Sequence, residues 1–137
     1  MKNPQTRALM IGKYGCLAMC YLYCMGIIPE SEGEMIKHIS TAMDKGLLDE
    51  ECTVLNASAL LQFFTGKNWH VEKKEIKDIS RIKEPTPVRY VYFDEKGKEH
   101  GHWVVVEDGK IVFNSIEDSV CVKIGKPASA RIITLYK

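Results

Sequence analysis

Three side chains in this sequence have the types needed for acyl transfer, and each is expected at the end of a helix or strand. Cys16 begins an apolar helix predicted over residues 15–26, where free N–H groups and the helix dipole stabilise a thiolate. His102 begins an apolar strand, which can hold its imidazole as a general acid and base. Asn114 follows the next predicted strand and can orient an imidazole. The residue types and their order predict a nucleophile, its base and the group that orients the base.

Each of the three residues also has a purely structural interpretation when it is taken alone. Cys16 shares one helix face with Cys20 and Cys24, and free cysteine is often a small buried hydrophobic residue. His102 can be incidental at a strand start, and Asn114 can belong to an ordinary turn. The chemical interpretation therefore depends on the three side chains meeting in the folded chain.

A tight turn predicted at Asp108-Gly109 decides whether Asn114 reaches His102. The dipeptide Asp-Gly is a strong signal for a two-residue turn between antiparallel strands. Counting outward from this turn places residues 102–104 beside residues 113–115. The amide of Asn114 is therefore expected next to the imidazole of His102, where it can select the tautomer that faces the sulfur.

The elements that position these residues are predicted as helices first and strands afterwards. Ser31 and Asn56 can cap helices that end at Gly46 and Gly66. Runs rich in β-branched and aromatic residues then predict strands over residues 69–71, 88–93, 102–106, 110–113, 119–124 and 130–136. This order predicts one α+β domain over residues 1–137, with N-terminal helices packed on a C-terminal antiparallel sheet that forms a meander.

Composition and charge argue against several classes of protein. The chain has 137 residues, of which 45% are hydrophobic and 27% charged, as in soluble globular domains. Its 19 basic and 18 acidic residues give a net charge of +1, without the basic surplus of nucleic-acid-binding proteins. The apolar stretch over residues 14–28 is shorter than the ~20 residues that span a bilayer and lacks a signal-peptide cleavage site. Neither nucleic acid nor a membrane is therefore expected as a partner.

The five cysteines do not have the pattern of a disulfide framework. Their number is odd, and three of them recur at a spacing that stacks them on one helix face, where bridging is difficult. Reduced thiols in a cytoplasm are the simpler interpretation. A metal site formed by Cys16, Cys20 and His100 or His102 is an alternative, although this spacing matches no common zinc motif. No metal and no other cofactor is therefore expected.

Three motifs together resemble those of a known family. They are Ile-Gly-Lys-Tyr-Gly-Cys ending at Cys16, Gly-His-Trp-Val-Val-Val around His102, and Phe-Asn-Ser around Asn114. The pattern resembles papain-like cysteine peptidases of the bacteriocin-leader-processing type, and more narrowly the short stand-alone relatives in bacterial and phage genomes. The segment after Asn114 is also similar to the tail of those proteins, whereas residues 30–83 contribute little to the resemblance.

The resemblance implies a papain-like fold and a role for each motif residue. Cys16 would be the nucleophile, His102 the general base and acid, and Asn114 the group that orients the imidazole. Family members use a glutamine upstream of the cysteine to donate to the oxyanion. Gln5 is the candidate here, although the usual separation points to Met10. The third catalytic position is commonly Asp followed by Pro, whereas this chain has Asn followed by Ser.

The implied activity is hydrolysis of a peptide or isopeptide bond in a peptide or protein substrate. The implied location is the cytoplasm of a bacterium or of a phage-infected host cell, and the oligomeric state is left open. Two other functions stay open as well. The same fold can serve a catalytically inactive binding protein, such as a phage accessory or inhibitor, and the missing glutamine favours that function. A cell-wall amidase would share the cysteine and histidine but prefer a second histidine or polar group next.

Overall fold

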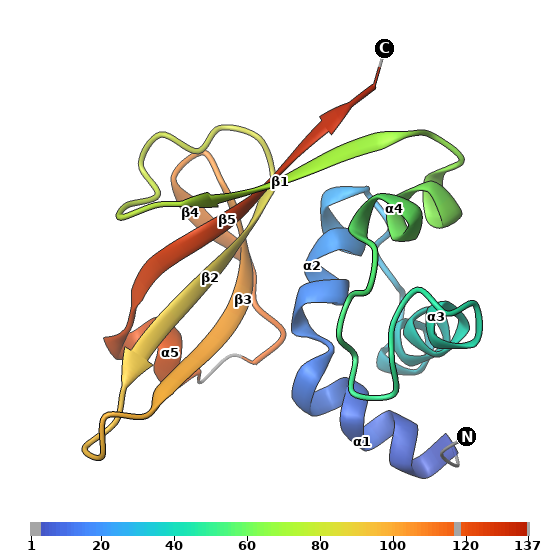
Figure 1. Ribbon diagram of the computed structural model, residues 1–137, viewed down its shortest axis with the longest axis horizontal. Coiled ribbons are helices and arrows are strands. Elements are labelled where there is room, and N and C mark those ends of the chain that lie inside the picture. The colour runs from blue at the N-terminus through green and yellow to red at the C-terminus, as the bar shows by residue number, and fades with distance from the viewer. Residues whose placement is uncertain (1–3, 117–118, 137) are drawn as a thin grey trace.

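The computed structural model describes residues 4–116 and 119–136 of the chain. Over these residues it has an α+β fold of five helices and one antiparallel sheet of five strands (Figure 1). The helices are α1 (Pro4–Tyr14), α2 (Cys16–Cys24), α3 (Glu32–Asp44), α4 (Ala57–Thr65) and α5 (Val120–Ile124). The strands are β1 (Trp69–Glu75), β2 (Thr86–Phe93), β3 (Glu99–Glu107), β4 (Lys110–Phe113) and β5 (Lys126–Leu135).

The order of strands in the sheet is β1-β5-β2-β3-β4, and all neighbouring strands are antiparallel. β2, β3 and β4 form the predicted meander, but β5 inserts between β1 and β2. The prediction of a meander for the whole sheet is therefore wrong. A long connection separates β1 from β2, and β5 supplies backbone hydrogen-bond partners to both strands.

Apolar side chains fill both faces of the sheet. Helices α1–α4 pack on one face, in a core that includes Ile11, Tyr21, Leu22, Ile39, Leu60 and Leu61 (Figure 1). The connection between β1 and β2, together with α5, covers a second core around Val88, Val104, Val106, Cys121 and Ala130. α2 buries Ala18, Cys20, Tyr21 and Leu22, which accounts for its almost wholly apolar sequence.

The caps predicted for α3 and α4 are confirmed. The side chain of Ser31 accepts a hydrogen bond from the Glu34 amide at 3.1 Å, and that of Asn56 accepts one from the Ala59 amide at 3.0 Å. α4 ends at Gly66, which has a φ of 74°. These helix ends are determined locally, because each capping group lies within one helical turn of its partner.

The turn between β3 and β4 is also confirmed. Asp108 and Gly109 both have positive φ, 51° and 72°, as a two-residue hairpin turn requires. β4 covers the predicted residues 110–113, while β3 begins earlier than predicted and covers residues 99–107. This hairpin holds His102 and leads into Asn114.

Three local predictions are wrong. Residues 119–124 were expected as a strand, but 120–124 form α5, which buries Cys121 and leaves Val120 and Ile124 exposed. β1 extends beyond the predicted residues 69–71 to Glu75, because β5 pairs with it along that length. Before Cys16 the chain forms α1, where the sequence predicted no helix. No described helix is long and apolar enough to cross a membrane.

Candidate active site

Cys16 is the first residue of α2, but this helix does not start in open chain. Only Gly15 separates α2 from α1. The N–H of Gly15 donates to the carbonyl of Ile11 at 2.8 Å, and the carbonyl of Gly15 accepts from Met19 at 3.0 Å. A Cβ at position 15 would lie 2.5 Å from the Ile11 carbonyl oxygen. Glycine is therefore needed at position 15, where the chain passes close to the last turn of α1 just before the cysteine.

The sulfur of Cys16 lies between the helix layer and the sheet. Burial raises the pKa of the Cys16 thiol, while backbone N–H groups of Trp103, Leu17 and Cys16 itself act in the opposite direction. The pKa remains above its ordinary value because desolvation of the thiolate is the larger effect. The expectation that the helix start stabilises the thiolate, and so lowers the pKa of the thiol, is therefore wrong. At neutral pH the thiol carries its proton, and its reactivity requires a base.

His102 and Asn114 are joined directly. The Nε2 atom of His102 lies 2.7 Å from Oδ1 of Asn114, and the Ile116 amide donates to the same oxygen at 3.0 Å. Because this atom accepts from a backbone N–H, it is the carbonyl oxygen of the side chain, and Nε2 of His102 must be the donor. The neutral imidazole therefore carries its proton on Nε2 and presents Nδ1 as a proton acceptor.

The register between β3 and β4 brings Asn114 to His102. Val105 pairs with Phe113, and a bulge shifts the register between Val105 and Val106. The predicted pairing of residues 102–104 with residues 113–115 is therefore displaced by about one residue. The side chain of Asn114 still reaches the imidazole, which is only 4% exposed.

Contacts at both ends of α2 align this helix with β3 and β4. At its start, the Trp103 amide is directed at the sulfur of Cys16. Near its end, the ring of Tyr23 stacks on Phe113 with 5.1 Å between centroids. Cys16 thus lies beside the residue that follows His102, and His102 is bonded to Asn114. The direct approach of the sulfur to the imidazole stays a prediction.

Gln5, the predicted oxyanion donor, has its backbone in the first turn of α1. Its side chain lies outside the part of the structure that is described. The segment from Gln5 to Tyr14 belongs to the helix α1. The role of Gln5 as an oxyanion donor therefore stays a prediction.

Arg131 of β5 is a residue near the site that the sequence analysis missed. Its guanidinium lies 4.8 Å from the centroid of the Trp103 ring and hydrogen-bonds to Tyr21 of α2. Its Nη1 atom is buried and has no hydrogen-bond partner within the described residues. Arg131 therefore links α2, which holds the cysteine, to β3, which holds the histidine. The sequence signal for this residue was its positive charge within the otherwise mostly apolar strand predicted over residues 130–136.

The alternative of a metal site has no support in the geometry. Across the residues that the structure describes, no group of three or more His, Cys, Asp or Glu side chains could hold a metal ion. His100, one of the suggested ligands, instead bonds to Asp94 at 2.9 Å and stacks on Tyr92. Cys20 is fully buried in the helix layer.

Comparisons with known proteins give no relative for this chain. Protein-family models, curated proteins and solved structures were compared with it, and none matches. Support for a function therefore comes from the arrangement of Cys16, His102 and Asn114 itself.

Proposed function

We propose that this protein is a papain-like cysteine peptidase or related amide hydrolase that cleaves a peptide or isopeptide bond. One arrangement carries the proposal. His102 donates from Nε2 to Asn114 at 2.7 Å, while the amide of the next residue, Trp103, is directed at the sulfur of Cys16. The cysteine, histidine and asparagine have the roles of nucleophile, base and orienting group in such enzymes.

The tautomer of His102 determines the proposed path of the proton. Nδ1 accepts the thiol proton as the sulfur of Cys16 attacks the carbonyl carbon of the substrate. Nδ1 then gives this proton to the leaving amine as the C–N bond breaks and a thioester remains on Cys16. Water attacks the thioester with His102 as general base, which releases the carboxylic acid and restores the thiol.

The raised pKa of Cys16 favours proton transfer during the attack over a permanent thiolate–imidazolium pair. Burial disfavours the thiolate in the resting protein, so His102 must remove the proton when substrate is bound. The Cys16 amide is the proposed first donor to the oxyanion, and Gln5 is the candidate for the second. Loss of one such donor typically costs about 2.7–4 kcal/mol of transition-state stabilisation.

The test is hydrolysis of a mixed peptide library, followed by mass spectrometry, with isopeptide-linked peptides and purified peptidoglycan as separate arms. Wild-type protein should cleave at least one class of substrate, and Cys16→Ala should abolish the cleavage. Cys24→Ala is the matched control on the same helix and should retain it. Cleavage of peptidoglycan alone would identify a cell-wall amidase. Equal cleavage by wild type and Cys16→Ala would refute the proposed nucleophile.

A catalytically inactive binding protein of the same fold is the second candidate. The observation in its favour is the raised pKa of the Cys16 thiol. A cysteine with a purely structural role also has a buried thiol that is not activated. This candidate predicts no hydrolysis by the wild type and no effect of His102→Ala on alkylation of Cys16. For a hydrolase we expect the opposite: hydrolysis by the wild type and an effect of His102→Ala on alkylation of Cys16.

A further inference from the structure

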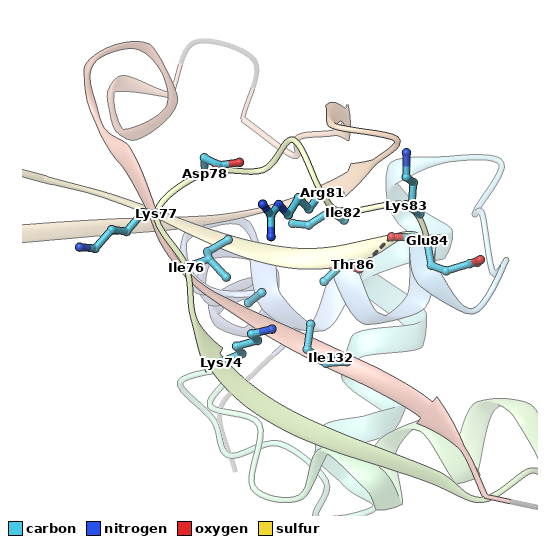
Figure 2. A pocket seen from close by; sticks show the side chains of 11 residues that line it. Lys74, Ile76, Lys77, Asp78, Arg81, Ile82, Lys83, Glu84, Thr86 and Ile132 are labelled. Atoms are coloured by element: carbon cyan, nitrogen blue, oxygen red, sulfur yellow. Dashed lines mark hydrogen bonds between the residues drawn. The ribbon is translucent and has the colours of Figure 1, made fainter.

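A cavity lies on the face of the sheet opposite α1–α4. The connection between β1 and β2 extends over β1, β5 and β2 and borders this cavity, which has a volume of about 410 Å³ and opens to solvent (Figure 2). Pockets of this size hold small ligands. Neither Cys16 nor His102 lines this cavity, so it is separate from the candidate active site.

The floor of the cavity is aliphatic. It is formed by Ile76, Ile82, Ala130 and Ile132, which belong to the apolar layer on this face of the sheet. None of the 11 residues that line the cavity is aromatic. The floor therefore suits a saturated hydrocarbon chain better than a ring that requires stacking partners.

The walls carry an excess of positive charge. Figure 2 shows Lys74 and Arg81 directed toward the cavity from different walls, whereas Lys77 and Glu84 point away from it. The charged residues in the lining are four basic and two acidic ones: Lys74, Lys77, Arg81, Lys83, Asp78 and Glu84. An anionic group would therefore be attracted to the space between Lys74 and Arg81.

The acidic residues nearby do not form ion pairs with Lys74 or Arg81. Asp78 accepts hydrogen bonds from the amide and the hydroxyl of Ser80 at 2.9 and 2.6 Å, and Arg81 acts on it only through its charge. Among residues 4–116 and 119–136, no ion pair joins Lys74 or Arg81 to a carboxylate. Two cations thus face an apolar floor without a bonded counter-ion.

We propose that this cavity binds an aliphatic carboxylate, with its carboxylate between Lys74 and Arg81 and its hydrocarbon chain on the isoleucine floor. Arginine can make two parallel hydrogen bonds to a carboxylate, and burial of the chain adds a hydrophobic contribution. A free fatty acid and the C-terminal carboxylate of a peptide with aliphatic side chains share this chemistry. The site does not depend on the proposed hydrolase activity.

The first experiment titrates wild-type protein with octanoate and with octanol, and follows backbone amides by two-dimensional ¹H–¹⁵N NMR. Octanoate should shift the amides of Ile82, Ala130 and Ile132 in a saturable manner, and octanol should bind about tenfold more weakly, since it lacks the charge. Acetyl-Val-Ile-Leu with a free C-terminus, compared with its C-terminal amide, forms the peptide arm. Tighter binding of octanoate identifies a fatty-acid site, and tighter binding of the peptide acid identifies a peptide-terminus site.

The second experiment separates the two inward cations from the outward one. Lys74→Met and Arg81→Met should each weaken binding of the better acid about tenfold, as expected for loss of a charge-assisted hydrogen bond. Lys77→Met removes the same charge from a side chain that points away, and should leave the affinity within about twofold. The proposal is overturned if octanol binds as tightly as octanoate and the peptide amide as tightly as the acid. It is also overturned if Lys77→Met weakens binding as much as Lys74→Met, or if neither acid gives saturable shifts.

Discussion

The two ends of α2 carry the same residue type in different chemical surroundings. At the start of the helix, the sulfur of Cys16 receives backbone N–H groups, including that of Trp103, the residue that follows His102. At the end, burial and the charge of Glu107 raise the pKa of Cys24 to about 12. Both thiols are partly removed from water, but backbone N–H groups oppose the rise in pKa only at Cys16.

This difference shows that the strand beside the helix determines the chemistry of each thiol. Desolvation raises the pKa of both cysteines, so burial does not distinguish them. β3 directs the Trp103 amide at the sulfur of Cys16, and its last residue, Glu107, places a carboxylate near Cys24. The comparison can be tested at both ends of the helix.

The largest expected effect is loss of His102, the proposed base for Cys16. In wild-type protein, iodoacetamide at pH 7 should alkylate Cys16 about 100-fold faster than Cys24, since a general base typically contributes at least ~100-fold. His102→Ala should remove most of this difference. Tandem mass spectrometry locates the label on each cysteine. His70→Ala, on β1, is the control, and an unchanged rate in His102→Ala would mean that the imidazole does not act on the thiol.

The second effect concerns the anchor of α1, which positions the start of α2. Arg7 is 7% exposed and contacts Asp44 at 2.7 Å and Glu50 at 2.8 Å. Arg7→Ala should lower the free energy of unfolding by about 2 kcal/mol, because a buried charge network loses its centre. Urea denaturation measures this loss, with the exposed Lys37→Ala as control. We expect slower alkylation of Cys16 and an unchanged rate at Cys24; equal changes at both ends would contradict a local role of α1.

The third effect is loss of the group that holds the imidazole. Asn114→Ala should reduce the alkylation rate of Cys16 about tenfold, which corresponds to one hydrogen bond of about 1.4 kcal/mol. Long-range ¹H–¹⁵N NMR should show the Nε2–H tautomer of His102 in the wild type and a mixture in the variant. Asn114→Asp should retain the rate, since a carboxylate accepts the same bond. Ser115→Ala is the neighbouring control, and a wild-type imidazole protonated on Nδ1 alone would contradict the assignment.

The smallest effect is expected at the other end of the helix. Glu107→Gln should lower the pKa of Cys24 and raise its alkylation rate at pH 9 about threefold, because burial remains the larger cause. Cys16 should not change, and Glu95→Gln in the β2–β3 loop is the control. An equal increase at both cysteines would mean that the effect of Glu107 is not local.

The raised pKa of Cys24 also determines how the stability of the protein changes with pH. The folded-state pKa of Cys24 is about 12, above the ordinary value of 9.0, so above pH 9.0 the unfolded chain loses a proton that the folded chain keeps. Stability from this group is therefore present below pH 9.0 and decreases as the pH rises toward 12. Glu107→Gln should reduce this decrease in urea denaturation series.

Local structure was predicted well where its cause lies within a few residues. The caps at Ser31 and Asn56 and the turn at Asp108-Gly109 need only the hydrogen-bonding groups of their immediate neighbours. Where distant contacts decide the structure, the predictions are wrong. α5 forms because Cys121 packs into the second core, and α1 is held by ion pairs to Asp44 and other distant residues.

For the candidate site, the amino-acid sequence by itself determined the residue types, the helix that begins at Cys16, and the hairpin that carries His102 toward Asn114. These features follow from apolar patterning and turn chemistry, which act over short distances along the chain. Only the tertiary structure decided that β5 enters the middle of the sheet, that Arg131 links the two elements of the site, and that burial raises the pKa of the Cys16 thiol. The physical reason is that desolvation and the alignment of α2 with β3 depend on residues far apart in sequence, whose separation in space no local pattern encodes.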